Sequence, residues 1–173
     1  MLQAKSSPGS WLKKLDESLA QKEKYETLKA ERIKGLEKLL LNSNSLNTKY
    51  DIYKQLFEEY KTNQYDSAVI YANRCLQTAN QLKDVNAIAQ AKCAVAFCQI
   101  SAGIMMEALP QLKSTNSQDL RLDIRQQYYE VMAKFWRENA DFVHDNPYYD
   151  RYITISNNYM DSLVNILPVH SAK

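Results

Sequence analysis

The fold is decided by residues 65–82, which read YDSAVIYANRCLQTANQL. Apolar side chains recur in this stretch every three or four residues, the spacing of one face of an α-helix. These positions are Tyr65, Ala68, Val69, Ala72, Cys75, Leu76, Ala79 and Leu82. Three of them are alanines, whose small side chains let a second helix approach closely. The pattern therefore predicts an amphipathic helix packed against other helices.

The segment before this stretch predicts its partner. From Tyr50 onward, Tyr53, Phe57 and Tyr60 share one helical face, and the polar run at residues 61–63 ends the pattern. Two helices joined by so short a turn run antiparallel and form a helical hairpin.

The hairpin recurs along the chain. A second apolar helix is predicted from Ile88 to Ala102, ending at Gly103, and its partner begins at Met105. In this alignment Ala68 and Ala108 are equivalent and 40 residues apart. A third pair is predicted from about residue 118 through 142 and from residue 146 to 167, with Pro147 in the first turn of its second helix. A helix pair repeated about every 40 residues predicts an all-α solenoid of antiparallel helix pairs.

Residues 63–72, NQYDSAVIYA, resemble the second helix of the tetratricopeptide repeat (TPR). The second pair matches the same motif through Ala96, Gly103 and Ala108. The unit departs from the motif in its length, which exceeds 34 residues, and in Ala72, which takes an aromatic position. The repeat-ending proline is also missing after Leu82. The resemblance implies a TPR-like superhelix.

Several short segments are also similar to an uncharacterised family of membrane-bound regulators of Bacteroidota. They are residues 11–16, 29–33, 53–60, 64–68, 149–153 and 161–163. Members of that family begin with an extracytoplasmic helical-repeat region. The resemblance implies a protein-interaction or sensor domain, as the N-terminal part or a truncated form of a signalling or transcriptional regulator. It carries over no catalytic residue.

The composition agrees with an all-α chain, because 173 residues include only three glycines and four prolines. The glycines stand far apart, which excludes a glycine-rich nucleotide-binding loop. A β-sandwich or β-barrel needs a turn about every ten residues, and these few glycines and prolines would not supply them.

The predicted organisation has four parts: a disordered start at residues 1–9, a helical segment at 10–41, the TPR-like region at 46–167, and a tail at 168–173. Two helix breakers fall inside predicted helices. Gly35 predicts either close packing or a bend, and Pro110 predicts a kinked or shortened helix.

The charge balance bears on partners and location. Twenty-two basic and twenty acidic residues are mixed along the chain, giving a net charge of +2. A nucleic-acid-binding protein would carry a basic stripe, so we expect no nucleic-acid partner. No apolar run is long enough for a membrane span, and the N-terminus has no signal-peptide pattern. The location is therefore open: periplasmic if the family resemblance holds and a signal peptide is missing, otherwise cytoplasmic.

Candidate catalytic and metal sites are weak. Cys75, Cys93 and Cys98 are odd in number and lack zinc-site spacing, so they are interpreted as buried small hydrophobic residues. Asp141, His144 and Asp145 share a helical face, but no further histidine or cysteine completes a metal shell, and the interpretation is a helix C-terminus. We expect no catalytic residue, no cofactor and no metal.

Twelve tyrosines are the most unusual feature of the composition. Most of them are expected to fill the spaces between helices. A remainder could contact a ligand or peptide, because tyrosine combines an apolar ring with a polar tip. The predicted groove or partner contacts are Tyr129, Trp136, Arg137 and Tyr148.

The leading functional hypothesis is a non-enzymatic module that binds a protein or peptide in the concave groove of the repeat stack. A stand-alone cytoplasmic TPR adaptor is one alternative, favoured by the unpaired thiols and the missing signal peptide. A helical-bundle enzyme or metal protein is the other. The apolar last helix predicts a missing neighbouring helix or a homodimer contact through Ile155, Leu163, Ile166 and Leu167.

Overall fold

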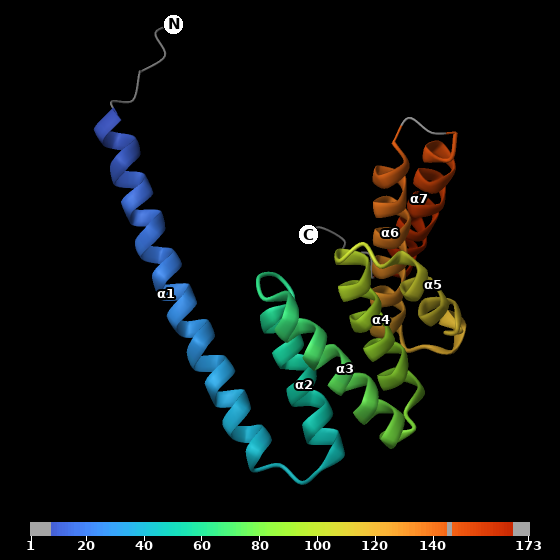
Figure 1. Cartoon of the computed structure of the whole chain (residues 1–173), viewed down its shortest axis with the longest axis horizontal. Helices are drawn as coiled ribbons and strands as arrows, with labels where there is room; N and C mark the ends of the chain where they lie inside the picture. Colours follow the sequence, from blue (N-terminus) through green and yellow to red (C-terminus); the bar gives the residue numbers. More distant parts are fainter. Residues whose placement is uncertain (1–7, 145–146, 168–173) are drawn as a thin grey trace, which may run out of the picture. The chain divides into compact units, whose positions relative to one another are not determined.

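The computed structural model describes residues 8–144 and 147–167. The described chain divides after Ser43 into two units (Figure 1). The first unit is a single helix and the second contains all the helix pairs. The predicted disordered start, up to residue 7, and the predicted tail at 168–173 lie outside the described residues.

The helix of the first unit, α1, covers Pro8–Leu41 and is 34 residues long. It begins two residues before the predicted boundary and passes through Gly35 without interruption. A β-carbon added at Gly35 would meet nothing within 4 Å. The expectation of close packing at this glycine is therefore wrong.

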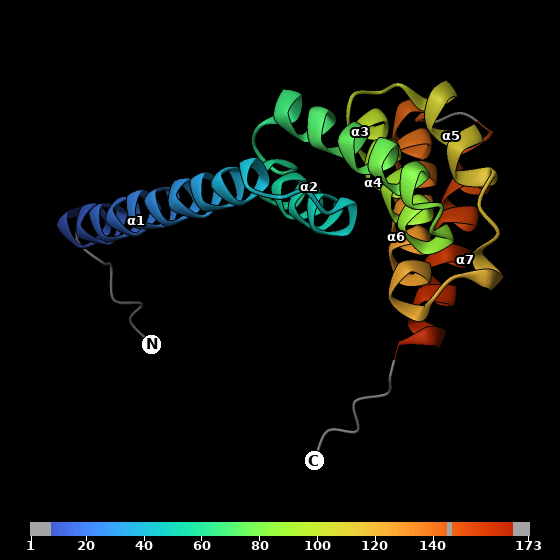
Figure 2. The same cartoon turned by 90° about the horizontal axis from the view of Figure 1, so that it is seen from below.

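The second unit is a stack of three antiparallel helix pairs. The pairs are α2 (Leu46–Tyr60) with α3 (Tyr65–Leu82), α4 (Val85–Ser101) with α5 (Met105–Lys113), and α6 (Leu122–Val143) with α7 (Tyr149–Ile166). Each helix packs against the next one in the sequence, and α4 also packs against α6 (Figures 1 and 2). The prediction of an all-α stack of antiparallel helix pairs is confirmed.

Side-chain caps begin two of these helices. The Ser45 hydroxyl accepts the backbone N–H of Thr48 at 3.5 Å ahead of α2. The Asp84 carboxylate accepts the N–H of Ala87 at 2.8 Å ahead of α4. Each cap satisfies one of the backbone donors that a helix N-terminus leaves without an intrahelical partner.

A glycine ends α4 as the sequence predicts. Gly103 has φ of 76°, its N–H bonds to the carbonyl of Ile100 at 3.0 Å, and the N–H of Ile104 bonds to the carbonyl of Gln99 at 2.8 Å. These two bonds are those of a Schellman motif, in which a left-handed residue closes the last helical turn. The turn directs the chain back along α4 into α5.

Small residues form the seams between the helices. Ala72, Ala79, Ala96, Ala108 and Ala140 are completely buried. Larger side chains fill the spaces between them, and Leu56, Leu112 and Ile124 are also fully inaccessible. The alanines of residues 65–82 therefore pack as predicted.

The pair α6 and α7 carries a buried polar contact. Ser156 is 2% exposed, and its hydroxyl donates to the carbonyl of Ala133 at 2.9 Å. Because this bond satisfies the buried hydroxyl, a serine is accommodated where other seams have alanine.

Two predicted boundaries are wrong. The third pair begins at Leu122 rather than near residue 118, since a short 3-10 helix, η1 (Ser117–Asp119), and an extended residue, Leu120, precede it. Leu120 is only 4% exposed, so its apolar side chain belongs to the core without belonging to the helix. Pro147 lies in a turn two residues before α7 rather than in its first turn; Asn146 lies outside the described residues.

The proline in α5 has the expected effect. Pro110 lies inside this helix, which is nine residues long and ends three residues later. A proline lacks the N–H that would bond to the preceding turn, so the helix is short. No helix in the described part of the chain is long and apolar enough to cross a membrane.

Gly35 inside α1 and Gly103 at the end of α4 allow a matched stability test. We expect Gly103→Ala to lower the free energy of unfolding by about 1 kcal/mol, because an L-residue is strained in the left-handed region. Gly35→Ala is expected to raise helix stability by about 1 kcal/mol, because alanine is the better helix former. Chemical denaturation followed by circular dichroism measures both. Equal effects of the same sign would contradict this account of the two positions.

Candidate functional site

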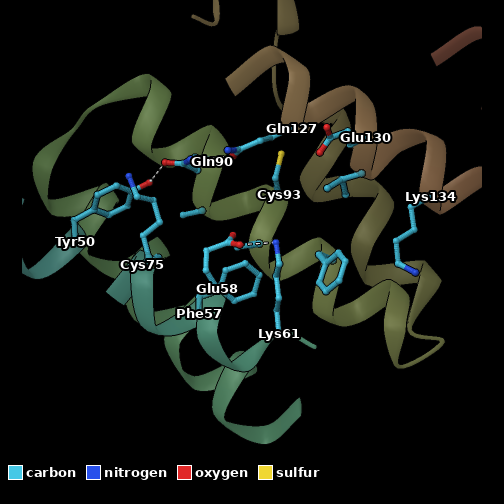
Figure 3. Close-up of a pocket in the computed structure, with 15 residues that line it drawn as sticks. Tyr50, Phe57, Glu58, Lys61, Cys75, Gln90, Cys93, Gln127, Glu130 and Lys134 are labelled. Carbon is cyan, nitrogen blue, oxygen red and sulfur yellow. Dashed lines mark hydrogen bonds and ion pairs between the residues drawn. The ribbon is translucent and has the colours of Figure 1, made fainter. Parts of the chain in front are cut away.

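The first helices of the three pairs together line a groove. Side chains from α2, α4 and α6, with Cys75 of α3, surround a space of about 190 Å³ (Figure 3). The groove therefore lies on the face that the first helices share.

Three hydrogen-bonding side chains cross one end of the groove. The Tyr50 hydroxyl lies 3.1 Å from the carbonyl oxygen of Ala87 and 3.0 Å from Oε1 of Gln90, and Nε2 of Gln90 donates to Oε1 of Gln127 at 2.9 Å. Tyr50 and Gln90 are 40 residues apart, and Gln90 and Gln127 are 37 apart. The three side chains thus occupy equivalent positions in successive first helices, and they form what we call the polar ladder.

Burial strongly favours the neutral form of the tyrosine in this ladder. Desolvation, with smaller effects from Cys75 and nearby carboxylates, raises the pKa of Tyr50 well above its usual value. The hydroxyl therefore keeps its proton and remains a donor in the ladder.

An aromatic surface lies two helical turns further along. Phe57, Phe97 and Lys134 each follow a member of the polar ladder by seven residues. The Phe57 and Phe97 rings meet edge to face with centroids 6.3 Å apart, and Nζ of Lys134 lies 5.6 Å from the Phe97 centroid. The second row of equivalent positions thus provides apolar rings beside an ammonium group.

Three lysines line the groove, and each has an acidic neighbour three or four residues away in the sequence. Nζ of Lys54 lies 3.5 Å from Asp51 Oδ1, Lys61 pairs with Glu58, and Nζ of Lys134 lies 2.7 Å from Glu138 Oε1. The lysine side chains are 39%, 35% and 31% exposed. Ion pairs in such partly exposed positions contribute little stability, so the ammonium groups are available to a ligand.

Burial makes the thiols near the groove unreactive. Cys75 and Cys93 line the groove yet are buried, and desolvation raises the pKa of each thiol to about 12. Burial also raises the pKa of Cys98 to about 11. All three are free cysteines. The interpretation of these residues as buried small hydrophobic side chains is confirmed.

The four predicted contact residues lie elsewhere, on and near the α6–α7 pair. Tyr129 is half-buried, and its ring lies between Tyr128 and Tyr159 at 5.9 and 6.1 Å. Arg137 is exposed on α6. None of the four is among the residues that line the groove.

Two of the four meet on one tyrosine. The ring centroid of the half-buried Trp136 lies 5.3 Å from that of Tyr152, and Tyr148, which is 52% exposed, stacks on Tyr152 with centroids 6.2 Å apart. Tyr148, Tyr152 and Trp136 thus form an aromatic cluster that connects the start of α7 to α6.

Sequence reasoning missed the residues that line the groove. When each helix is considered alone, the sequence around Gln90, Gln127 and Phe97 resembles that of an ordinary helix surface. The signal that could have identified them is the repeat itself, because a 40-residue shift places Tyr50 over Gln90 and Phe57 over Phe97.

The cluster at the end of α6 shows no metal site in the described residues. The backbone N–H of His144 bonds to the carbonyl of Ala140 at 3.1 Å, and the ring meets Tyr149 edge-on at 6.4 Å. Asp145 lies outside the described residues. Among those that are described, no group of three histidine, cysteine or acidic residues could hold a metal ion.

The last helix is exposed along one side. Met160, Val164 and Leu167 are 43%, 62% and 46% exposed and follow one another at helical spacing. Of the residues proposed for a dimer contact, Leu163 is buried and Ile155 and Ile166 are half-buried, which leaves Leu167 on the exposed side.

Comparison with known proteins gives one match. The profile of the family described as "SusR N-terminal TPR domain" matches residues 19–173. Neither a curated protein nor a solved structure matches the chain significantly.

The buried thiols predict slow modification of the native protein. At about pH 8 an ordinary cysteine is partly ionised, whereas these three remain protonated and covered. We expect a thiol reagent such as 5,5′-dithiobis(2-nitrobenzoate) to modify all three cysteines in guanidinium chloride and none of them rapidly in buffer. Rapid reaction of a thiol in the native chain would contradict the burial described above.

Proposed function

The chain belongs to the family of SusR N-terminal TPR domains, and we propose on this premise that it is a non-enzymatic interaction module that binds a protein or peptide in the groove of α2, α4 and α6. A TPR domain is typical of protein binding, and this family is part of a SusR-type regulator. Binding in the groove would then be the input that the regulator senses.

The observation that carries the proposal is the pair of glutamines on the groove surface. An amide side chain has two N–H donors and an acceptor oxygen. The ladder uses the oxygen of Gln127 and leaves its N–H donors without a partner among the described residues. A peptide backbone offers the carbonyl groups that such donors bind, and its own N–H groups fit the acceptor oxygens.

The rings two turns away add affinity to this polar recognition. Phe97 is half-buried and borders the groove, where it contacts both Phe57 and Lys134. An apolar or aromatic side chain of a bound peptide would remove the exposed part of this ring from water. Partly exposed lysines at the edge favour a peptide that also carries acidic residues.

Several observations support a non-catalytic role. The thiols near the groove are protonated and buried, so they are poor nucleophiles. The three lysines that line the groove each pair with an acidic residue three or four positions away in the sequence. These pairs are typical of a binding surface rather than of an acid–base site.

Peptide selection tests this proposal. Peptides would be selected from a random displayed library on the immobilised chain, and their affinity measured for Phe97→Ala/Gln127→Ala. We expect binding to weaken about 100-fold, because both a buried ring contact and amide hydrogen bonds are removed. The matched control is Arg137→Ala/Tyr148→Ala, which changes an equal number of side chains outside the groove and should bind normally.

If the groove variant remains helical by circular dichroism and binds the selected peptides as the unchanged chain does, the groove is not the binding site. Loss of binding only in the Arg137→Ala/Tyr148→Ala control would assign the site to the α6–α7 aromatic cluster instead.

A further inference from the structure

The single helix of the first unit exposes an unusual amount of apolar surface. Trp11, Leu12, Leu15, Tyr25 and Leu39 are between 54% and 67% exposed. Helices in proteins gain most of their stability by burying an apolar face, and propensity alone contributes little. These exposed side chains therefore indicate that α1 has a partner.

The apolar residues of α1 follow a heptad repeat. Alternating steps of three and four residues from Leu12 reach nine positions, of which the outer six are leucine or isoleucine and the middle three are charged. The nine residues are Leu12, Leu15, Leu19, Lys22, Glu26, Lys29, Ile33, Leu36 and Leu40. The alternating steps of three and four residues are the spacing of a two-stranded coiled-coil seam, and the outer six positions have the apolar side chains that such a seam requires.

The three central charges select the orientation of a self-pair. In a parallel pair each seam residue faces its own counterpart, so Lys22, Glu26 and Lys29 would each meet a like charge. In an antiparallel pair centred between Lys22 and Glu26, each of these residues faces the other one on the second copy. The two side chains already point the same way, since Lys22 Nζ lies 3.6 Å from Glu26 Oε1 within one helix.

The same register pairs the outer apolar positions. Leu12 faces Leu36 of the second copy, and Leu15 faces Ile33 of the second copy. Leu19 lies against the aliphatic stem of Lys29, whose ammonium group can extend to water. One antiparallel register therefore satisfies both the apolar and the charged part of the seam.

The register also explains the exposed side chains beside the seam. Trp11, Tyr25 and Leu39 directly precede Leu12, Glu26 and Leu40, three seam residues that are 14 residues apart and therefore share one position of the seven-residue repeat. In an antiparallel pair, residues of this kind flank the seam on one side and meet their counterparts. Trp11 then lies near Leu39 of the second copy, and Tyr25 lies near its own counterpart.

We propose that α1 is a dimerisation helix that pairs with α1 of a second copy as an antiparallel coiled coil, oriented by Lys22 and Glu26. Because the repeat region follows residue 43 in each chain, this pairing attaches the two repeat regions at opposite ends of the coiled coil. The partner is a second copy of the same chain, since the seam is complementary to itself in charge and in side-chain size.

Sedimentation equilibrium of the full 173-residue chain tests the pairing. We expect twice the mass of the chain, and Leu15→Asp/Leu19→Asp should weaken dimerisation by at least about 100-fold, because it places four charges in the apolar seam of the dimer. Leu28→Asp is the matched control on α1, since Leu28 is 41% exposed but lies away from the seam. Val164→Asp is the control for a contact through α7. Both controls should remain dimeric.

Charge exchange tests the orientation without touching the apolar positions. Lys22→Glu and Glu26→Lys should each weaken an antiparallel dimer by about tenfold, because each creates like-charge contacts. The double variant Lys22→Glu/Glu26→Lys should restore it. In a parallel pair these positions already carry like charges, so the single variants would have no such effect.

Four results would overturn the proposal. They are a wild-type chain that stays monomeric, a dimer lost through Val164→Asp rather than through the α1 seam, single charge variants that dimerise normally, and a monomer whose α1 binds anionic phosphatidylserine vesicles instead.

Discussion

The close approach of neighbouring helices at alanine seams is the constraint on which the repeat region depends. Ala72, Ala79, Ala96, Ala108 and Ala140 have no accessible surface. The distance between two packed helices follows from the side chains at their contact. A larger residue at any of these positions would separate a pair and change the spacing of the helices that follow. The geometry of the groove is therefore set at the seams rather than in the groove itself.

With the seams fixed, equivalent residues of successive first helices come into contact. Tyr50, Gln90 and Gln127 form the polar ladder, and Phe57 with Phe97 continues the same alignment two turns away. The ladder satisfies buried polar groups and keeps other donors at the surface. One row of side chains thus stabilises the register of the stack and borders the groove that we propose as the binding surface, which links the packing of the fold to its proposed function.

Sequence reasoning predicted the helix pairs because packing and turn signals coincide. These signals are the alanine spacing, Gly103 and the polar run after Tyr60. Each of them determines structure within a few residues of its own position, so each can be recognised from the sequence. The start of α6 was missed because Leu120 is buried although its backbone is extended. The hydrophobicity of this residue indicates that it is buried, but not that it lies in a helix.

The groove was missed because its glutamines and lysines are polar residues when each helix is considered alone. Their role depends on contacts across units 40 and 37 residues long, which one-helix patterns do not contain. Tyr129 and Trp136 are half-buried and contact rings of α7, and their role as partner contacts stays a prediction.

Hydrogen–deuterium exchange of the chain, with and without a peptide selected on it, tests most directly whether the shared face of the first helices is the binding surface. Bound peptide should slow exchange in α4 and α6, around residues 90–97 and 127–134, and leave the exposed side of α7 unchanged. Slower exchange confined to α7, or to the aromatic cluster of Trp136, Tyr148 and Tyr152, would contradict the assignment of the groove as the site of recognition.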